Sequence, residues 1–184
     1  MENLLDALRH ETSKLHQTLH VQPLLKSCQE GTMTKEEYIH LLKAFYSPWK
    51  FLAIAIDLVP IAVLRPKLKS RMQAIQEDLM KLNVNQSIFK PITPKLKPSQ
   101  KELLGMSYVL IGSSMGASML SAKIKESLGD VPVSYLSMSP KEAGWPELVS
   151  ELRRLESKDY ALALTAACST FKLIKDELSV KSGS

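Results

Sequence analysis

The sequence lacks the features of a secreted, disulfide-rich or membrane-spanning protein. Its 184 residues include two cysteines, Cys28 and Cys168, which are too few for a disulfide scaffold and do not have the spacing of a zinc motif. The first residues show no cationic stretch followed by an apolar run, so we expect no signal peptide. The longest apolar segment, residues 51–64, is interrupted by Asp57 and Pro60 and is too short to cross a membrane. We therefore expect a cytoplasmic protein.

Acidic residues are scarce in the segment 65–101. It holds two acidic residues against nine basic ones, which are Arg65, Lys67, Lys69, Arg71, Lys81, Lys90, Lys95, Lys97 and Lys101. The difference gives this segment a charge of +7 within a chain whose net charge is +5. Such a surface favours an anionic partner, and we expect an acidic protein rather than nucleic acid because no recognition motif is present. A solvated lysine-rich face is the alternative interpretation.

No alternating strand pattern is present, and helical periodicity extends along most of the chain. Leu4, Leu8, Leu15 and Leu19 form one stripe of a first helix over residues 2–20. Later helix starts are marked by three capping boxes, which pair Thr34 with Glu37, Ser99 with Glu102, and Ser139 with Glu142. We expect about six helices in one all-α domain over residues 1–178, followed by a flexible tail over 179–184.

Other elements follow from prolines, glycine and periodicity. Further helices are expected at 65–82 and 158–178, and Gly129 is expected to end the helix that starts after Ser99. Pro48 predicts a kink or an irregular turn in the second helix. The proline-spaced residues 90–98 predict an extended connector.

Glycine is scarce, yet three of the seven glycines fall inside the predicted helix 99–129. At 100° per residue, Gly105, Gly112 and Gly116 lie on one stripe without side chains. Each interior glycine costs about 1 kcal/mol relative to alanine, so the stripe requires a compensating use. That use is either close packing of another helix or contact between the backbone and a flat ligand. Lys123 lies on the same face, where it could meet carboxylates of such a ligand.

A flat apolar ligand with anionic edges is well described by heme, and heme requires an axial ligand. His16 borders the apolar stripe of the first helix, whereas His10 lies nearly opposite to it and is expected at the surface. A histidine in this position is also compatible with a purely structural role. His16 and His20 have the i, i+4 spacing of a zinc pair, but no third ligand is recognisable, so we do not expect zinc.

Five segments of the sequence, in order, resemble the bacterial biliverdin-producing heme oxygenases found beside iron-acquisition systems and phytochromes. The segments are LRHETSKLHQTL, RPKLKSRMQAIQEDLMKL, LLGMSYVLIGSSMGASML, AGWPELVSEL and AACSTFKLI. The first resembles the family's opening helix and the third its glycine-containing distal helix. Together they cover most of the chain.

The resemblance implies a heme-degrading enzyme. Heme is then both cofactor and substrate, and reductive activation of O2 yields biliverdin, ferrous iron and CO. His16 is implied as the axial iron ligand, Gly112 and Gly116 as the distal wall, and Ser113, Tyr108 and Lys123 as contacts to the propionates or the pocket. Electrons would come from a reductase, ferredoxin or flavodoxin, and the basic segment 65–101 would suit an acidic donor.

One residue departs from the family pattern. Family members usually carry a glutamate directly before the Gly-Ser of the distal helix, where this sequence has Ile111. On the helical wheel Ile111 lies away from the glycine stripe, so we expect it to face neighbouring helices. Since the stripe has no acid–base side chain beside it, a peroxidase or catalase is disfavoured. The alternatives are a catalytically inactive heme-binding or interaction protein of the same fold, and a plain helical regulatory or DNA-binding domain.

Overall fold

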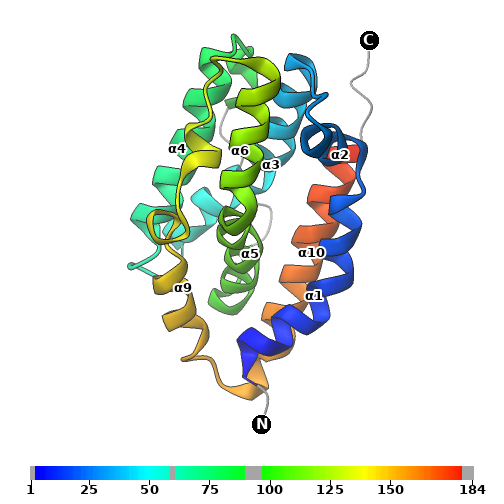
Figure 1. The fold of residues 1–184 in the computed structure, drawn as a ribbon. Coiled ribbons are helices and arrows are strands. Elements are labelled where there is room, and N and C mark those ends of the chain that lie inside the picture. The colour runs from blue at the N-terminus through cyan, green and yellow to red at the C-terminus, as the bar shows by residue number, and fades with distance from the viewer. Residues whose placement is uncertain (1–2, 59–60, 90–96, 180–184) are drawn as a thin grey trace.

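The computed structural model describes residues 3–58, 61–89 and 97–179, which contain helices and no strand (Figure 1). This confirms the all-α class. The α-helices are α1 (Leu4–His20), α2 (Pro23–Glu30), α3 (Lys35–Ala55), α4 (Arg65–Lys81), α5 (Gln100–Gly112), α6 (Ser114–Leu128), α7 (Ser134–Ser137), α8 (Pro140–Ala143), α9 (Trp145–Leu152) and α10 (Tyr160–Ser179). Three 3-10 turns, η1 (Ile56–Leu58), η2 (Gln86–Phe89) and η3 (Ser157–Asp159), complete the described elements.

The predicted capping boxes all form. At the start of α5, the backbone N–H of Glu102 donates to Ser99 Oγ at 3.3 Å, and the N–H of Ser99 donates to the Glu102 carboxylate at 2.7 Å. The boxes at Thr34 and Ser139 have the same reciprocal pattern at α3 and α8. Gly129, with φ of +72°, follows the last residue of α6 as predicted.

Three predictions about helix boundaries were incomplete. The sequence analysis did not identify α2, although Pro23 begins it and Gly31, with φ of +71°, ends it. Pro48 lies inside α3, which continues to Ala55, so the predicted irregular turn is absent and the predicted kink stays a prediction. The predicted helix 99–129 is divided at Ser113 into α5 and α6. Most of the expected connector 90–98 and of the expected tail 179–184 lies outside the described residues, although Ser179 still belongs to α10.

Helix α10 lies at the centre of the packing. It packs against α5 on one side and along α1 on another, and it also contacts α3 (Figure 1). The leucine stripe of α1 explains its place in the bundle, because Leu4, Leu8 and Leu19 are buried. Helices α1 and α5–α6 run in the same direction along the molecule (Figure 1).

A buried polar cluster holds α7 against α3 and α4. Asp78 is fully buried and accepts hydrogen bonds from the backbone N–H groups of Ser134 at 3.0 Å and Tyr135 at 2.8 Å. The guanidinium of Arg71, also fully buried, lies 4.3 Å from the Tyr135 ring centre and 5.4 Å from the Trp49 ring centre. These contacts join short α7 to two long helices, and α7 in turn packs against α6.

The prediction of a strongly basic surface at 65–101 was therefore partly wrong. Arg71 is interior, and several other cations of the segment pair with carboxylates elsewhere in the chain. The pairs are Arg65 and Lys69 with Asp57 at 3.2 and 3.1 Å, Lys67 with Glu147 at 3.8 Å, and Lys101 with Asp159 at 3.2 Å. Lys90 and Lys95 lie outside the described residues.

By length and composition, the stretch Gln100–Leu128 meets the criterion for a membrane-crossing helix. Half of its apolar window is buried inside the bundle, and core helices meet the same criterion. The stretch is also divided at Ser113. Its apolar character is thus explained by packing within this fold.

Candidate functional site

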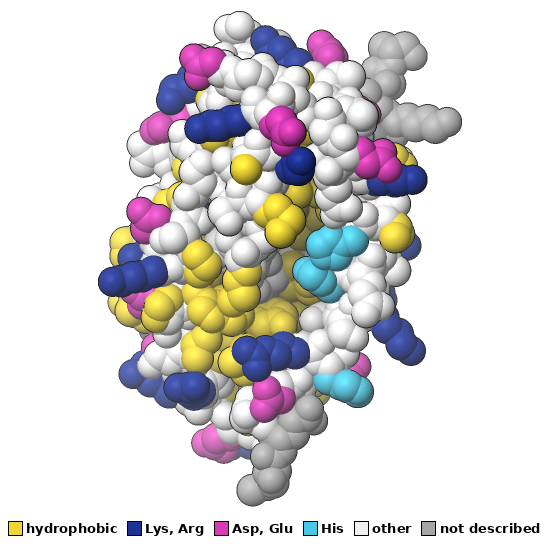
Figure 2. Space-filling model, viewed as in Figure 1, with side chains coloured by type: hydrophobic (Ala, Val, Ile, Leu, Met, Phe, Trp, Pro, Cys, Tyr) yellow, Lys and Arg dark blue, Asp and Glu magenta, His cyan; other side chains and the backbone are white. Residues whose placement is uncertain are grey.

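A hollow lined by hydrophobic side chains opens on the face that carries α1 and α6 (Figure 2). Histidine side chains border it on the α1 side, and basic side chains lie around its lower end (Figure 2). Helix α1 packs mainly on α10, so it stands apart from α6 along this face. The hollow therefore separates the histidine-bearing helix from the glycine-bearing helix.

His16 is an exposed residue whose imidazole is nevertheless partly covered by two other rings. Its ring centre lies 4.6 Å from that of His20 and 6.0 Å from that of Phe171 in α10, both in T-shaped arrangements. Burial of the ring, and to a smaller extent the nearby His20, lower the pKa of His16 below its usual value. This shift favours the neutral imidazole, which is the form that binds a metal. His10, as predicted, is exposed, and lies 3.7 Å from Glu11.

The glycine stripe divides into a packed end and an open end. A Cβ added at Gly105 would lie 2.1 Å from the carbonyl oxygen of Ala163, so this glycine is required where α5 meets α10. A Cβ added at Gly116 in α6 would have no atom within 4 Å. Of the two uses that the sequence left open, helix packing is confirmed at Gly105, whereas contact with a flat ligand at Gly116 stays a prediction, for which the open space leaves room.

Gly112 lies between these extremes and faces an indole. A Cβ at Gly112 would make ordinary contact, at 3.5 Å, with the ring of Trp145. The same ring lies 6.0 Å from the centre of the Tyr108 ring. Trp145 follows Gly144, whose φ of +96° favours glycine and whose added Cβ would lie 2.9 Å from side-chain carbons of Lys67. Trp145 and Tyr108 thus form an aromatic wall beside Gly112.

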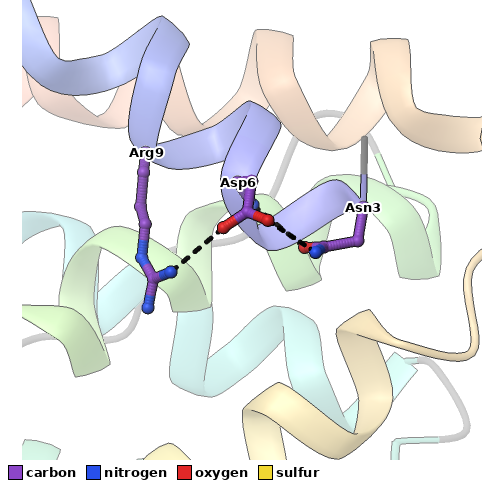
Figure 3. A network of polar contacts seen from close by, with 3 residues as sticks. All are labelled: Asn3, Asp6 and Arg9. Carbon is purple, nitrogen blue, oxygen red and sulfur yellow. Dashed lines mark hydrogen bonds and ion pairs between the residues drawn. The ribbon is translucent and has the colours of Figure 1, made fainter. Parts of the chain in front are cut away.

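The amino-terminal end of α1 adds a cation that the sequence analysis did not single out. Arg9 lies seven residues before His16 and therefore on the same face of α1. Its Nη1 donates to one carboxylate oxygen of Asp6 at 3.1 Å, and the Asn3 amide donates to the other at 2.6 Å (Figure 3). Asn3 also caps the helix by accepting from the backbone N–H of Asp6.

Tyr108 links this end of α1 to α5. Burial raises the pKa of the Tyr108 hydroxyl, while the nearby Thr12 hydroxyl and Arg9 partly offset that increase. Arg9 is thus close enough to the phenol hydroxyl of Tyr108 to act on it electrostatically. This pair can bind a carboxylate.

The two other predicted contacts are already engaged within the protein. Lys123 pairs with Glu126 at 2.9 Å and lies at the exposed surface near Cys28. Ser113 donates its hydroxyl proton to the Leu110 carbonyl at 2.7 Å, which leaves its lone pairs free to accept. Ile111 is fully buried in the core, as its place on the helical wheel predicted.

The described residues contain no group of three or more histidine, cysteine or acidic side chains that could hold a metal ion. An arrangement of one imidazole opposite an uncovered stretch of backbone, with a carboxylate-binding pair at one end, instead suits a flat metal complex. The sequence profile of the heme oxygenases matches residues 2–178. The chain belongs to the heme oxygenase family.

Solved structures of heme oxygenases have the same fold. The enzyme from Leptospira interrogans is 19% identical with a TM-score of 0.78, covering 97% of this chain and 99% of its own. Heme oxygenase-1 from the cyanobacterium Synechocystis, solved in complex with heme, is 16% identical with a TM-score of 0.73, covering 96% and 91%. The NO- and CO-bound enzyme from Neisseria meningitidis is 20% identical with a TM-score of 0.69, covering 100% and 96%. No curated protein sequence matches this chain significantly.

Proposed function

We propose that this protein is an active heme oxygenase that cleaves heme to biliverdin, ferrous iron and CO, with His16 as the axial iron ligand. The observation that carries the proposal is the open backbone at Gly116, where an added Cβ would meet no atom within 4 Å. Gly116 is the third residue of α6, where glycine is a weaker helix former than alanine and no neighbour requires it, so a ligand lying against the backbone would supply the compensation.

The residues around the hollow fit heme. His16 offers a neutral imidazole, Trp145 and Tyr108 offer apolar surface, and Gly116 leaves room on the opposite side. When bound there, heme supplies both the iron that activates O2 and the ring that is cleaved. Neither Gly112 nor Gly116 has an acid–base side chain next to it in the sequence, so a proton would have to arrive through ordered water. Ser113 Oγ can accept a hydrogen bond from such water.

Two cations could bind the carboxylates of heme, one at each end of the hollow. Arg9 lies seven residues before His16, and Lys123 lies seven residues after Gly116, which in each case is about 10 Å along the helix axis. Both cations are exposed and paired with a carboxylate on their own helix, Arg9 with Asp6 and Lys123 with Glu126. We favour Arg9 because it also acts electrostatically on Tyr108, which could serve as a second donor. Lys123 remains the alternative anchor.

Electrons must come from a separate donor, which we propose to be an acidic reductase, ferredoxin or flavodoxin. The basic side chains around the lower end of the hollow would attract such a protein (Figure 2). Their attraction weakens with salt, so turnover driven by a protein donor should fall as ionic strength rises.

The test is a hemin titration of the purified protein followed by addition of ascorbate under air. We expect a stoichiometric Soret band of histidine-ligated heme, and then its replacement by biliverdin absorbance. His16→Ala should abolish the histidine-ligated spectrum, whereas His10→Ala, at the exposed position on the same helix, should leave it unchanged.

Each result has a defined meaning. An unchanged Soret band in His16→Ala would reject the axial ligand. A histidine-ligated complex that forms no biliverdin would favour the alternative, a heme-binding protein of this fold without catalysis. Failure of the wild-type protein to bind hemin would reject both.

A further inference from the structure

The imidazole of His16 is held by rings from two different helices. His20 lies one turn later on α1, with its ring plane at 77° to that of His16 and the ring centres 4.6 Å apart. Phe171, on α10, contributes a ring at 88° with a centre distance of 6.0 Å. Phe171 is only 7% exposed, so the core fixes its position.

A third residue contacts the ring of His20. The amide Nε2 of Gln29, in α2, lies 3.4 Å from Nδ1 of His20. With the amide in this orientation its nitrogen donates to Nδ1, and neutral His20 carries its proton on Nε2. The ring of His20 is thereby tied to α2 as well as to α1.

His16 itself makes no hydrogen bond to any described residue. Glu11 and Gln17, its polar neighbours in the sequence, do not contact its ring, and Glu11 instead lies near His10. The orientation of the His16 ring therefore depends on the packing of other rings. This arrangement differs from the common one, in which a carboxylate or carbonyl oxygen orients a metal-binding histidine.

We propose that His20 and Phe171 are positioning residues that fix the plane of the His16 imidazole above the heme, with Gln29 holding His20 in place. The proposal rests on the proposed heme function for its consequence at the iron. An axial imidazole held at one angle transmits that angle to the electron distribution of the ferric heme. We call the contacts of the His20 and Phe171 rings with the His16 ring the ring clamp. The clamp then determines the orientation of the axial imidazole, although neither positioning residue touches the iron.

The first experiment needs no heme. Ring-nitrogen NMR of the apoprotein, at a pH where both histidines are neutral, should show His20 with its proton on Nε2. Gln29→Leu should shift that ring toward a mixture of tautomers. Relaxation of the His16 ring carbons should show greater mobility in Phe171→Leu than in wild type, and Phe171→Tyr should restore the wild-type value.

The second experiment uses hemin and cyanide. In the ferric cyanide complex, the pattern of heme-methyl proton shifts reports the angle of the axial imidazole plane. We expect His20→Ala and Phe171→Leu to change this pattern while the Soret band remains that of histidine-ligated heme. Gln17→Ala on α1 and Leu173→Ala on α10 are matched controls at exposed neighbouring positions and should leave the pattern unchanged.

The outcomes separate this proposal from the proposed function. An equally mobile His16 ring in wild type and Phe171→Leu overturns the clamp whether or not hemin binds. Unchanged methyl shifts in both positioning variants overturn its effect at the iron. If wild type fails to bind hemin, the heme function is rejected, and the apoprotein measurements still decide the clamp.

Discussion

Helices α5 and α6 are two halves of one apolar stretch, yet they use glycine in opposite ways. Gly105 in α5 lies against the backbone of Ala163, whereas Gly116 in α6 has open space on its free side. The sequence makes the two residues look equivalent, because both lie on one stripe. The difference shows that one glycine stripe can combine a structural contact with an open stretch of backbone, and that the neighbouring helix decides which one applies.

The largest expected effect comes from filling the open end. Gly116→Leu should abolish stoichiometric hemin binding, because its side chain would occupy the space where the ligand lies. The free energy of unfolding of the apoprotein should equal or exceed that of wild type, because leucine has a higher helix propensity than glycine. A hemin titration together with urea denaturation of the apoprotein measures both quantities.

Normal hemin binding in Gly116→Leu would show that the open end is not the ligand surface. Met119→Gln, on the same helix at a side chain that is 71% exposed, is the control and should change neither quantity.

A substitution at the packed end, at Gly105, should instead lower the free energy of unfolding. Gly105→Ala places a methyl group 2.1 Å from the Ala163 carbonyl oxygen, so two helix backbones must separate. We expect the free energy of unfolding to fall by about 3 kcal/mol or more, the upper end of overpacking costs. Gly116→Ala should instead raise it by about 1 kcal/mol. Equal effects of the two substitutions, measured by urea denaturation, would contradict the division of the stripe.

A smaller effect, on hemin affinity, should show whether α5 or α6 lies beside the carboxylates of heme. Arg9→Ala removes the cation next to Tyr108 of α5 and should weaken hemin affinity by roughly tenfold, as expected for a lost charged hydrogen bond of about 1.5 kcal/mol. If Arg9 is the anchor, Lys123→Ala on α6 should change affinity less than Arg9→Ala, although each cation pairs with a carboxylate on its own helix. The reverse ranking, or a changed biliverdin isomer in Lys123→Ala alone, would move the anchor to α6.

The smallest effect concerns the start of α5. Ser99→Ala removes the cap of this packed helix and should cost about 1 kcal/mol of unfolding free energy at neutral pH. Hydrogen bonds from Ser99 lower the pKa of Glu102, so the glutamate contributes stability above its unfolded pKa. That contribution is lost as pH falls through the folded pKa.

The difference between wild type and Ser99→Ala should therefore shrink in acid, as measured by urea denaturation at several pH values. Ser139→Ala is the matched control, because it removes the same capping box from α8, a helix of four residues. A pH-independent difference at Ser99 would exclude the glutamate from the cap.

The sequence contained the local signals of the fold and fewer of its long-range ones. Capping boxes, the leucine stripe of α1 and the glycine at the end of α6 were readable because each acts within a few residues. The division at Ser113 was missed because a serine inside a helical pattern gives no strong stop signal. Arg71 was assigned to the surface because only the fold encloses it between Trp49 and Tyr135.

The candidate site shows the same limit. His16 and the open glycine at 116 could be selected from helical periodicity. The contact of Gly105 with Ala163, and that of His16 with Phe171, join residues far apart in the chain, so no local pattern encodes them. The role of His20 had a visible signal, its i, i+4 spacing from His16, but that spacing was weighed only as a zinc pair.

Gly144 lies outside the hollow, yet it constrains one of its walls. Any other residue there would face both a left-handed backbone and the side chain of Lys67 at 2.9 Å. That strain would have to be relieved by the Lys67 side chain or by the adjoining peptide, and the next side chain along is the indole that faces Gly112. In the proposed heme complex, a substitution at Gly144 would thus displace this wall of the hollow and change which edge of the ring is cut.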